Sequence, residues 1–331
     1  MSPKKRQPQA DAARLEVLAA NGDERAFAEV ARDVLANGGR LVRERALEII
    51  ARQPRPVLRD ALRDLYAELD ADGAKRDQGA RMRVAIVRAL TEIGDVRDAD
   101  IALAASGCYE AVFGEDLTTG LRMYGLRMLA RLDPALFRFV AAETIEATEQ
   151  RSPKPPVEPA KVAFELLAQL EEWTLIYDWL LREHRDLELQ AFVLELFTGG
   201  PRPAVERYVR RTLADAVARE QEATVMALAD AVVRLRLDAL YGALATTLRA
   251  RISDELYGYL AMLLAGAGEE RLLAVLEEEL HGGRRPRIVA EALRLRPRPE
   301  TEALLRRWEA GERQESCADP ALVRSRRRGG T

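Results

Sequence analysis

Histidine, cysteine and aromatic residues are scarce in this chain. Its 331 residues include two histidines and two cysteines, and aromatic residues make up 5%. Cys108 and Cys317 stand too far apart to suggest a disulfide framework, and no Cys/His cluster has the spacing of a metal site. His184 and His281 each lie near the end of an expected helix, a position that favours a structural cation over a general base. This scarcity argues against a zinc-dependent mechanism and predicts a reducing compartment.

Long apolar runs are missing as well. The longest uncharged run, residues 256–268, is shorter than the ~20 residues that a membrane-spanning helix needs. No apolar signal segment follows the N-terminus. No strand is evident before any glycine-rich loop, which argues against nucleotide binding. We therefore expect a cytoplasmic protein with no cofactor, no resident metal, no catalytic constellation and no membrane partner.

Helix-forming residues dominate the composition. Ala, Leu, Arg and Glu are frequent, whereas β-branched and aromatic residues are sparse, a balance that favours helices over sheets. Hydrophobic residues make up 48% of the chain, enough to bury a large core. Because the length exceeds the usual size of a single core, we expect an all-α fold built as two domains or as a repeat array.

The charge is nearly balanced overall but unevenly distributed. Lys and Arg total 51 against 54 acidic residues, for a formal net charge of −3. Both ends are basic, through Lys4, Lys5 and Arg6 at one end and Arg324, Arg326, Arg327 and Arg328 at the other. The body between them is therefore acidic, and an acidic body is a poor general binder of nucleic acid phosphate. We expect residues 1–10 and 311–331 to be disordered.

Residues 118–145 predict a helical hairpin. Apolar residues from Leu121 to Leu132 recur at spacings that keep them on one stripe of a helix. Asp133 and Pro134 follow, and this pair is typical of a helix N-terminus, because Asp caps the first turn and Pro is tolerated there. A second apolar stripe begins at Leu136. Such a hairpin leaves apolar flanks on both sides, so one copy predicts further copies beside it.

The same organisation recurs in residues 81–101. An apolar stripe from Val84 to Ile93 precedes Gly94 and Asp95, which mark a turn before the next helix. This window, like residues 121–140, resembles the HEAT-like repeats of α-solenoid proteins. The resemblance implies a right-handed α-solenoid of about eight to nine HEAT-like helical hairpins. In that arrangement residues 11–150 form an N-terminal array and residues 160–310 a C-terminal array, with the Pro-rich residues 151–159 as a hinge.

The helix expected at residues 174–183 is apolar over most of its circumference. Its bulky residues, from Trp173 to Leu181, cover roughly two thirds of the helix surface, wider than the stripe of an ordinary surface helix. Only Asp178 and Arg182 mark a polar strip. The pattern predicts a helix covered on both sides by neighbouring hairpins.

Two segments depart from the repeat and are candidates for function. The segment 106–117 combines apolar and acidic residues, and the polar segment 70–79 leaves the preceding hairpin. Both join consecutive hairpins, so we expect both at the same edge, where insertions often form a binding surface. We therefore predict a non-catalytic scaffold for protein partners, with Tyr109, Phe113, Glu115 and Asp116 as partner-binding residues. The alternative is that Tyr109 and Phe113 fill a gap between hairpins.

A nucleic-acid-binding function is the second hypothesis. Second helices of the expected hairpins carry arginines that could bind phosphate, Arg138, Arg182, Arg207, Arg210 and Arg211. Some HEAT-like proteins are DNA glycosylases of the alkylation-repair type, which use an acidic residue and tryptophans. The nearest match to that pattern is Trp173, Asp178 and Trp179, although the two tryptophans point to different sides of one helix.

Overall fold

The computed structural model describes residues 8–112, 115–150, 156–182 and 186–317. The fold is all-α, as predicted, apart from one pair of two-residue strands. The chain divides into two compact units, Met1–Leu196 and Phe197–Thr331. The boundary therefore falls after the expected hinge at 151–159, because α10 (Glu158–Gln169) packs against α8 (Thr119–Leu132) and α9 (Pro134–Gln150) within unit 1. Residues 151–155 of that hinge, and residues 1–7 and 318–331 of the ends expected to be disordered, lie outside the described residues. The remaining residues of those ends are helical, because residues 8–10 belong to α1 (Pro8–Asn21) and residues 311–317 to α19 (Pro299–Cys317).

Unit 1 contains twelve of the described α-helices, the last of which runs one residue into unit 2. In addition to α8, α9 and α10 they are α1 (Pro8–Asn21), α2 (Glu24–Asn37), α3 (Arg40–Arg52), α4 (Arg59–Asp70), α5 (Gly73–Arg76), α6 (Arg81–Ile93), α7 (Ala99–Gly107), α11 (Trp173–Leu180) and α12 (Leu187–Phe197). Two 3-10 turns, η1 (Pro56–Leu58) and η2 (Val96–Asp98), precede α4 and α7. Strands β1 (Ala111–Val112) and β2 (Glu115–Asp116) lie between α7 and α8.

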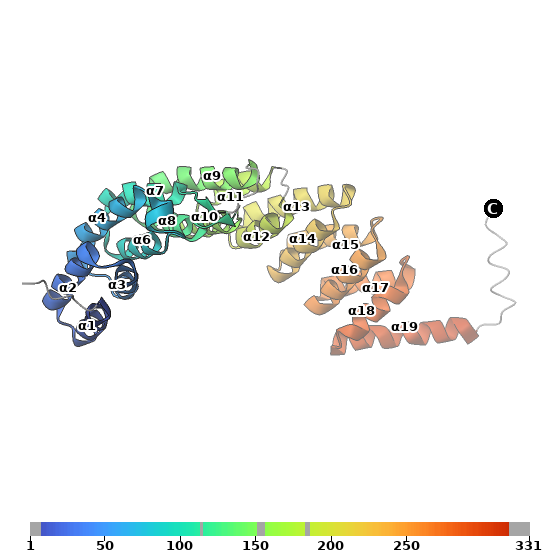
Figure 1. Cartoon of the computed structure of the whole chain (residues 1–331). Helices are drawn as coiled ribbons and strands as arrows, with labels where there is room; N and C mark the ends of the chain where they lie inside the picture. The colour runs from blue at the N-terminus through green and yellow to red at the C-terminus, as the bar shows by residue number, and fades with distance from the viewer. Residues whose placement is uncertain (1–7, 113–114, 151–155, 183–185, 318–331) are drawn as a thin grey trace, which may run out of the picture. The chain divides into compact units, whose positions relative to one another are not determined.

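The helices of unit 1 pack in a regular order. Helix α1 packs against α3, α3 against α6, α6 against α8, and α8 against α10, so that these helices form one row. Helices α2, α4, α7 and α9 flank that row, and Figure 1 shows α4, α7 and α9 along its upper edge. Each helix of the row touches the helix two or three places along the chain, as stacked hairpins require.

Unit 2 repeats this order. It contains α13 (Arg202–Ala218), α14 (Glu222–Arg234), η3 (Asp238–Leu240), α15 (Tyr241–Arg249), α16 (Asp254–Ala267), α17 (Glu270–Gly282), α18 (Pro286–Leu295) and α19 (Pro299–Cys317). Helices α14, α16 and α18 pack in one row, and α13, α15, α17 and α19 pack in a second row beside it (Figure 1). Apolar residues between the two rows form the core, among them Leu228, Leu244, Leu264 and Leu276.

The predicted turns are present where the sequence placed them. Helix α8 ends at Leu132, and the Asp133 carboxylate accepts a hydrogen bond of 3.0 Å from the Leu136 amide in the first turn of α9. Helix α6 ends at Ile93, and the Asp95 carboxylate accepts a hydrogen bond of 2.9 Å from the Arg97 amide in η2. Both turns are confirmed as helix boundaries fixed by an aspartate cap.

A glycine brings α7 and α8 into close contact. A Cβ atom placed on Gly125 in α8 would lie 2.5 Å from the Ser106 amide nitrogen and 2.9 Å from the Ala102 carbonyl oxygen in α7. No side chain fits between backbones at that separation, so glycine is required here. Because the loop between α7 and α8 joins the ends of these helices, this close packing also fixes where that loop emerges.

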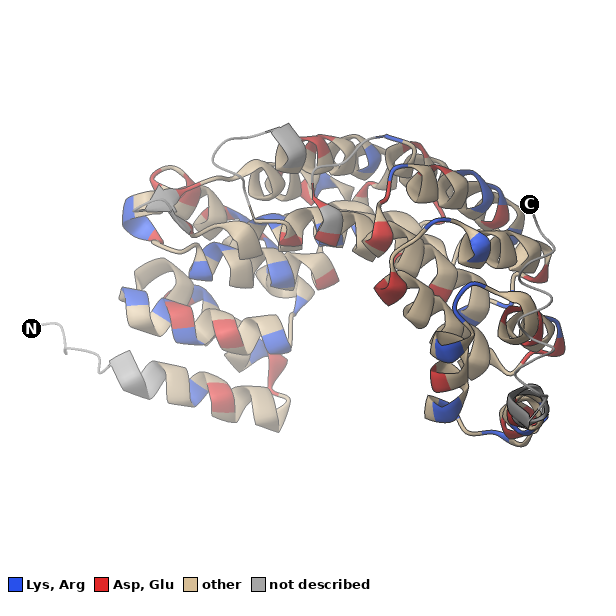
Figure 2. Cartoon of the chain, turned by 90° about the vertical axis from the view of Figure 1, so that its right-hand side faces the viewer, with Lys and Arg blue, Asp and Glu red and all other residues tan. Residues whose placement is uncertain are grey.

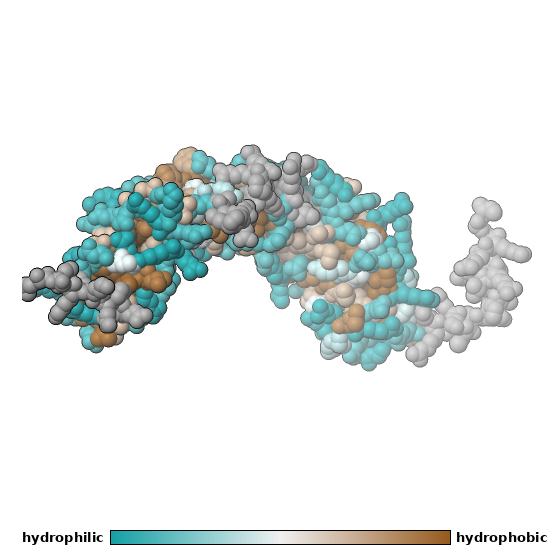
Figure 3. All heavy atoms as spheres, in the orientation of Figure 1, coloured by the Kyte–Doolittle hydropathy of each residue, from teal (hydrophilic) through white to brown (hydrophobic). Residues whose placement is uncertain are grey.

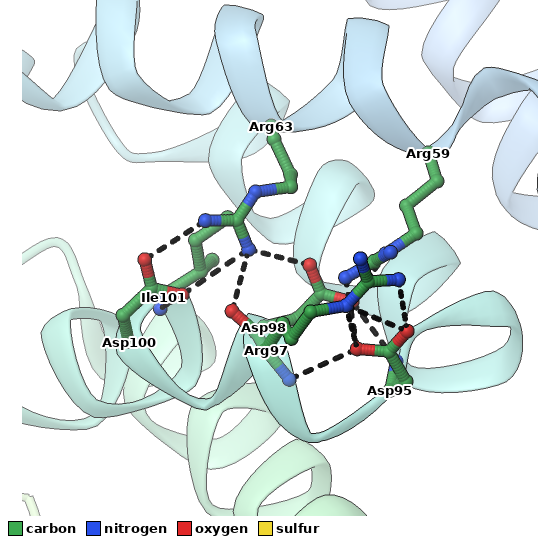
Figure 4. A network of polar contacts seen from close by, with 7 residues as sticks. All are labelled: Arg59, Arg63, Asp95, Arg97, Asp98, Asp100 and Ile101. Carbon is green, nitrogen blue, oxygen red and sulfur yellow. Dashed lines mark hydrogen bonds and ion pairs between the residues drawn. The ribbon is translucent and has the colours of Figure 1, made fainter.

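Polar contacts bind one flanking helix of unit 1 to the next. Arg59 and Arg63 on α4 both donate to the buried carboxylate of Asp98, which precedes α7, and Arg63 also binds Asp100. Figure 4 shows these side chains converging from the two helices. Comparable contacts recur in both units, where Arg138 on α9 binds Glu172 before α11, and Arg202 on α13 donates to Arg236 O before η3. In each of these contacts, an arginine on one helix holds the turn that precedes a later helix of the same unit.

Helix α11 is not covered on both sides, contrary to the prediction from its wide apolar surface. Ile176, Trp179 and Leu180 are buried, but the side chain of Leu175 is 37% exposed and Leu181 is exposed as well. Helix α10 covers one side of α11, and the described residues place no comparable helix over the other. An apolar surface is therefore left open on this helix.

Among the described helices, none combines the length and the hydrophobicity that crossing a bilayer requires.

Candidate functional site

The segment from Cys108 to Thr118 forms a closed loop between α7 and α8. Strands β1 and β2 pair antiparallel within it, with Ala111 opposite Asp116. The Leu117 amide donates to Glu110 O over 3.1 Å, and the Thr118 hydroxyl donates to Cys108 O over 3.0 Å. These bonds join the two ends of the loop, so its start and end are held together at the mouth of the α7–α8 hairpin.

A buried arginine on α6 anchors the first half of the loop. Arg83 is 1% exposed, and its guanidinium donates to Glu110 over 2.8 Å and to Asp70 over 3.2 Å. The completely buried Asp77 accepts from the backbone amide of Arg83 and caps α6. Burial opposes the charge of Arg83, but the hydrogen bond and the attraction of Glu110 outweigh it and raise the pKa of the guanidinium.

Arg83 also brings the two irregular segments of unit 1 together. Asp70 and Asp77 belong to the segment 70–79, whereas Glu110 belongs to the segment 106–117. A Cβ atom placed on Gly73 would lie 2.3 Å from a Glu110 carboxylate oxygen, so the two segments touch directly. The expectation that both emerge at one edge is confirmed, and the side chain that joins them is a single buried cation.

A second arginine anchors the other half of the loop. Arg122 on α8 is buried, pairs with the Asp116 carboxylate and donates to Cys108 O over 3.0 Å. The hydroxyl groups of Thr118 and Thr119 donate to the same carboxylate over 2.8 and 2.9 Å. Burial alone would raise the pKa of Asp116, but these donors hold it below its ordinary value. Asp116 is therefore an ionised residue that stabilises the loop from inside.

Among the described side chains of this loop, Tyr109 is a large apolar residue that is exposed. Its ring lies 5.5 Å from the Arg122 guanidinium in a cation–π contact, and 42% of the residue faces solvent. Beside it is a cavity of about 150 Å³, whose wall includes Leu103, Val140 and Pro159. Leu103 is exposed too. Tyr109 and Leu103 thus border a small recess, and the buried Arg122 contacts the Tyr109 ring.

The predicted partner-binding residues differ in what the structure assigns to them. Tyr109 lies on the surface, as the prediction requires, and does not fill a gap between hairpins. Asp116 is occupied within the loop and presents no free carboxylate. Phe113 lies outside the described residues, and of Glu115 only the backbone, in β2, is described. We therefore define the Tyr109 surface as Tyr109, Leu103 and the adjoining cavity.

The predicted phosphate-binding arginines fall into two groups. Arg138 is paired with Glu172, and Arg182 is paired with Asp178. The other three, Arg207, Arg210 and Arg211, are exposed on α13 and form no ion pair with any described residue. Figure 2 shows basic and acidic residues interspersed over the described helices of each unit.

The residues matched to the DNA glycosylase pattern do not converge. Asp178 is largely exposed and pairs with Arg182, whereas Trp179 is buried with its ring 4.9 Å from that of Phe164. Trp173, in the first turn of the same helix, is half-buried. An acidic residue that acts on a flipped base needs an enclosed pocket. The side chain of Asp178 is instead 60% exposed and already paired with Arg182.

Cys108 lies against the Arg83 cluster. Its Sγ atom is 3.6 Å from an Arg83 nitrogen and 3.7 Å from a Glu110 oxygen. Burial, supported by Glu110, raises the pKa of the thiol despite the nearby guanidinium. Since the thiolate is the reactive form, this environment makes Cys108 a poor nucleophile and assigns it a packing role.

Arg83 and Arg122 were not predicted as functional residues, although each is in phase with the buried face of its helix. Arg83 precedes Ile86, Val87 and Leu90 at the spacing of one buried helix face. Arg122 precedes Gly125, Leu126 and Leu129 in the same way on α8. An arginine in phase with a buried stripe predicts a buried cation, which in turn requires a carboxylate from a neighbouring segment.

Comparisons with known proteins add no assignment to these observations. Within residues 8–112, 115–150, 156–182 and 186–317, no group of acidic, histidine or cysteine side chains has the arrangement of a metal site. Neither a protein-family model, nor a curated protein, nor a solved structure matches the chain.

Proposed function

We propose that this chain is a non-catalytic protein-interaction scaffold built as an α-solenoid of HEAT-like hairpins. The successive packing of α1, α3, α6, α8 and α10 in unit 1, and of α14, α16 and α18 in unit 2, supports this architecture. A solenoid exposes a long surface relative to its core, and such surfaces commonly bind protein partners.

A recurring cation supports the repeat. Arg43, Arg83, Arg122 and Lys161 occupy the third or fourth residue of α3, α6, α8 and α10 and lie about 40 positions apart, a spacing typical of HEAT repeats. Each binds a carboxylate outside its own helix, such as Glu68 for Arg43 and Glu188 for Lys161. These four cations therefore recur in unit 1 about every 40 residues, a period that its apolar residues alone did not reveal.

The Tyr109 surface is the single observation that carries the proposed binding function. Large exposed apolar residues gather on the flanking helices of unit 1 and their loops, including Leu103, Tyr109 and Phe139, whereas unit 2 exposes Leu295 alone among its described large hydrophobic residues. Figure 3 shows apolar surface over the part of unit 1 where α7 and α9 lie. Exposed apolar residues beside a recess, on a loop anchored by two buried ion pairs, are typical of a prearranged protein-binding site.

Quantitative affinity purification tests this proposal. Wild-type chain and the Tyr109→Ser variant are used as baits, and recovered proteins are compared by mass spectrometry and then tested pairwise as purified components. We expect direct partners to bind Tyr109→Ser at least tenfold more weakly, because the aromatic anchor is lost. Val17→Ser, on exposed α1, is the matched control and should bind normally. Equal binding by wild type and Tyr109→Ser would show that this surface is not the binding site.

A second function, nucleic-acid binding, is favoured by the three arginines on α13. Arg207, Arg210 and Arg211 recur at helical spacing, are exposed and have no described acidic partner. A mobility-shift assay at two salt concentrations tests this alternative. Phosphate binding should weaken steeply as salt rises and should be reduced in Arg210→Gln, and absence of a shift at low salt would exclude it.

A further inference from the structure

Helices α9 and α11 form the two walls of an apolar groove in unit 1. Both helices pack on α10, and Leu167 of α10 lies at the bottom between them. Buried Ile145 from α9 and Trp179 from α11 complete the base of a cavity of about 340 Å³. The groove is thus larger than the recess beside Tyr109 and is formed mainly by helices.

Part of the apolar wall faces solvent. Leu175 on α11 lines the groove and is 37% exposed. Phe139, one turn before Ala142 on α9, does not line the groove but adds exposed apolar surface on the same helix. Burying apolar surface of this kind is favourable by about 25 cal/mol per Å². A partner side chain of aliphatic character would gain that free energy by entering the groove.

The described residues at the rim of the groove carry an excess of negative charge. Glu143 and Glu146 lie on α9, and Asp178 lies on α11. Among the described residues that line the groove, Arg182 is the single cation, and it pairs with Asp178 and, at 3.9 Å, with Glu146. Glu143 is exposed and forms no ion pair with a described residue. Three carboxylates against one guanidinium attract cationic groups and repel an acidic partner.

We propose that the α9–α11 groove binds a short segment of a partner protein in which an aliphatic pair is flanked by lysine or arginine. The apolar base accepts the aliphatic side chains, and the acidic rim selects the basic flanks. This inference rests on the proposed scaffold function and names the chemistry of one class of partner. The selection is electrostatic, since like charges at a rim disfavour binding while opposite charges guide it.

Fluorescence anisotropy with two labelled peptides tests this groove on the full chain. Both peptides contain the same Leu-Leu pair, flanked on each side by two arginines in one and by two glutamates in the other. We expect the arginine peptide to bind about tenfold more tightly, which corresponds to ~1.4 kcal/mol. Equal affinities for the two peptides, or no binding of either, would overturn the proposal.

Two variants separate the apolar contribution from the charge. Leu175→Gln should weaken binding of the arginine peptide severalfold, and Glu143→Lys should remove most of the preference for arginine over glutamate. Asp64→Lys, an exposed carboxylate on α4 outside the groove, is the matched control and should leave both affinities unchanged. Circular dichroism confirms the fold of each variant. An unchanged preference in Glu143→Lys would also overturn the proposal.

Failure here is distinguishable from failure of the scaffold function. The purification experiment depends on Tyr109, whereas Leu175 lines only the groove and not the cavity beside Tyr109. Glu143 borders both cavities, so Leu175→Gln is the variant that separates the two experiments. If direct partners bind Tyr109→Ser more weakly but neither peptide binds the groove, the scaffold function stands and the groove proposal fails.

Discussion

Arg59 donates a hydrogen bond of 2.8 Å to Asp98, a completely buried carboxylate that lies 39 positions further along the chain. Arg63 donates to the other oxygen of the same carboxylate over 2.5 Å, and the Asp95 amide adds a third donor. The turn before α7 is thereby fixed to α4 (Figure 4). Because burial makes an unpaired charge costly, this contact stabilises the array only while all its members are present.

Replacing Asp98 should therefore destabilise unit 1 strongly. Asp98→Asn leaves two guanidinium groups without their shared carboxylate, and we expect the free energy of unfolding to fall by about 3 kcal/mol. Asp100→Asn is the matched control, because Asp100 is 64% exposed in its side chain and binds the same Arg63, so its loss should cost less than about 1 kcal/mol. Denaturant unfolding of the three proteins measures both values. Similar losses in the two variants would contradict the assigned role of burial.

Acidification should weaken the same contact. Burial alone would raise the pKa of Asp98, but Arg59, Arg63 and the Asp95 amide lower it below its ordinary value. A lowered folded-state pKa means that the stabilisation is complete above the unfolded value of about 3.9 and is lost as pH falls through the folded value. The difference in unfolding free energy between wild type and Asp98→Asn should thus shrink below about pH 4. A difference that stays constant from neutral pH to pH 3 would disprove this linkage.

Much of the fold could be predicted from the sequence because helix boundaries are encoded locally. Asp133 with Pro134, and Gly94 with Asp95, mark turns through side chains and backbone angles that act within one helical turn. The division after Leu196 could not be predicted in this way, because it depends on packing between helices and not on a local proline signal. The wide apolar face of α11 predicted burial, yet Leu175 remains exposed, since composition does not specify which neighbours are present.

The candidate site was predictable only in part, for a related reason. Tyr109 was identified because its segment interrupts the predicted repeat, and such an interruption can be recognised in the sequence itself. The role of Asp116 was not, because a carboxylate in a loop gives no local sign that Arg122 will bury against it. Ion pairs between segments depend on tertiary structure, and the sequence indicates them only through an arginine in phase with a buried stripe.

Gly125 offers a test of the close packing between α7 and α8. In Gly125→Ala the new Cβ would meet the backbone of α7 at 2.5 Å, so we expect a loss of about 1–3 kcal/mol from overpacking. Gly120→Ala, also on α8, is the control, since its Cβ would meet only a Val84 methyl group at 3.9 Å. That change should be neutral or stabilise by up to about 1 kcal/mol through helix propensity. The unfolding temperature should therefore fall in Gly125→Ala and stay unchanged or rise in Gly120→Ala, as thermal unfolding of both variants would measure.

The loop that carries Tyr109 should open when its inner anchor is removed. Arg122→Met deletes the guanidinium that binds Asp116 and Cys108 O, leaving a buried carboxylate with hydroxyl and amide donors alone. The Glu110 and Leu117 amides, which close the loop, should then exchange hydrogen for deuterium at least tenfold faster. Hydrogen exchange measured by mass spectrometry over residues 108–118 provides the comparison.

Arg127→Met is the matched control for that experiment. Arg127 lies on the same helix and contacts the Tyr124 ring at 5.3 Å, but no described carboxylate pairs with it. Its replacement should leave exchange in the loop unchanged. If Arg122→Met lowers the unfolding temperature while loop exchange keeps its wild-type rate, Arg122 stabilises α8 alone and does not position Tyr109. If exchange accelerates only in the loop, the Tyr109 surface depends on a buried cation that no partner touches, and weakened partner binding by Arg122→Met should follow from loss of prearrangement.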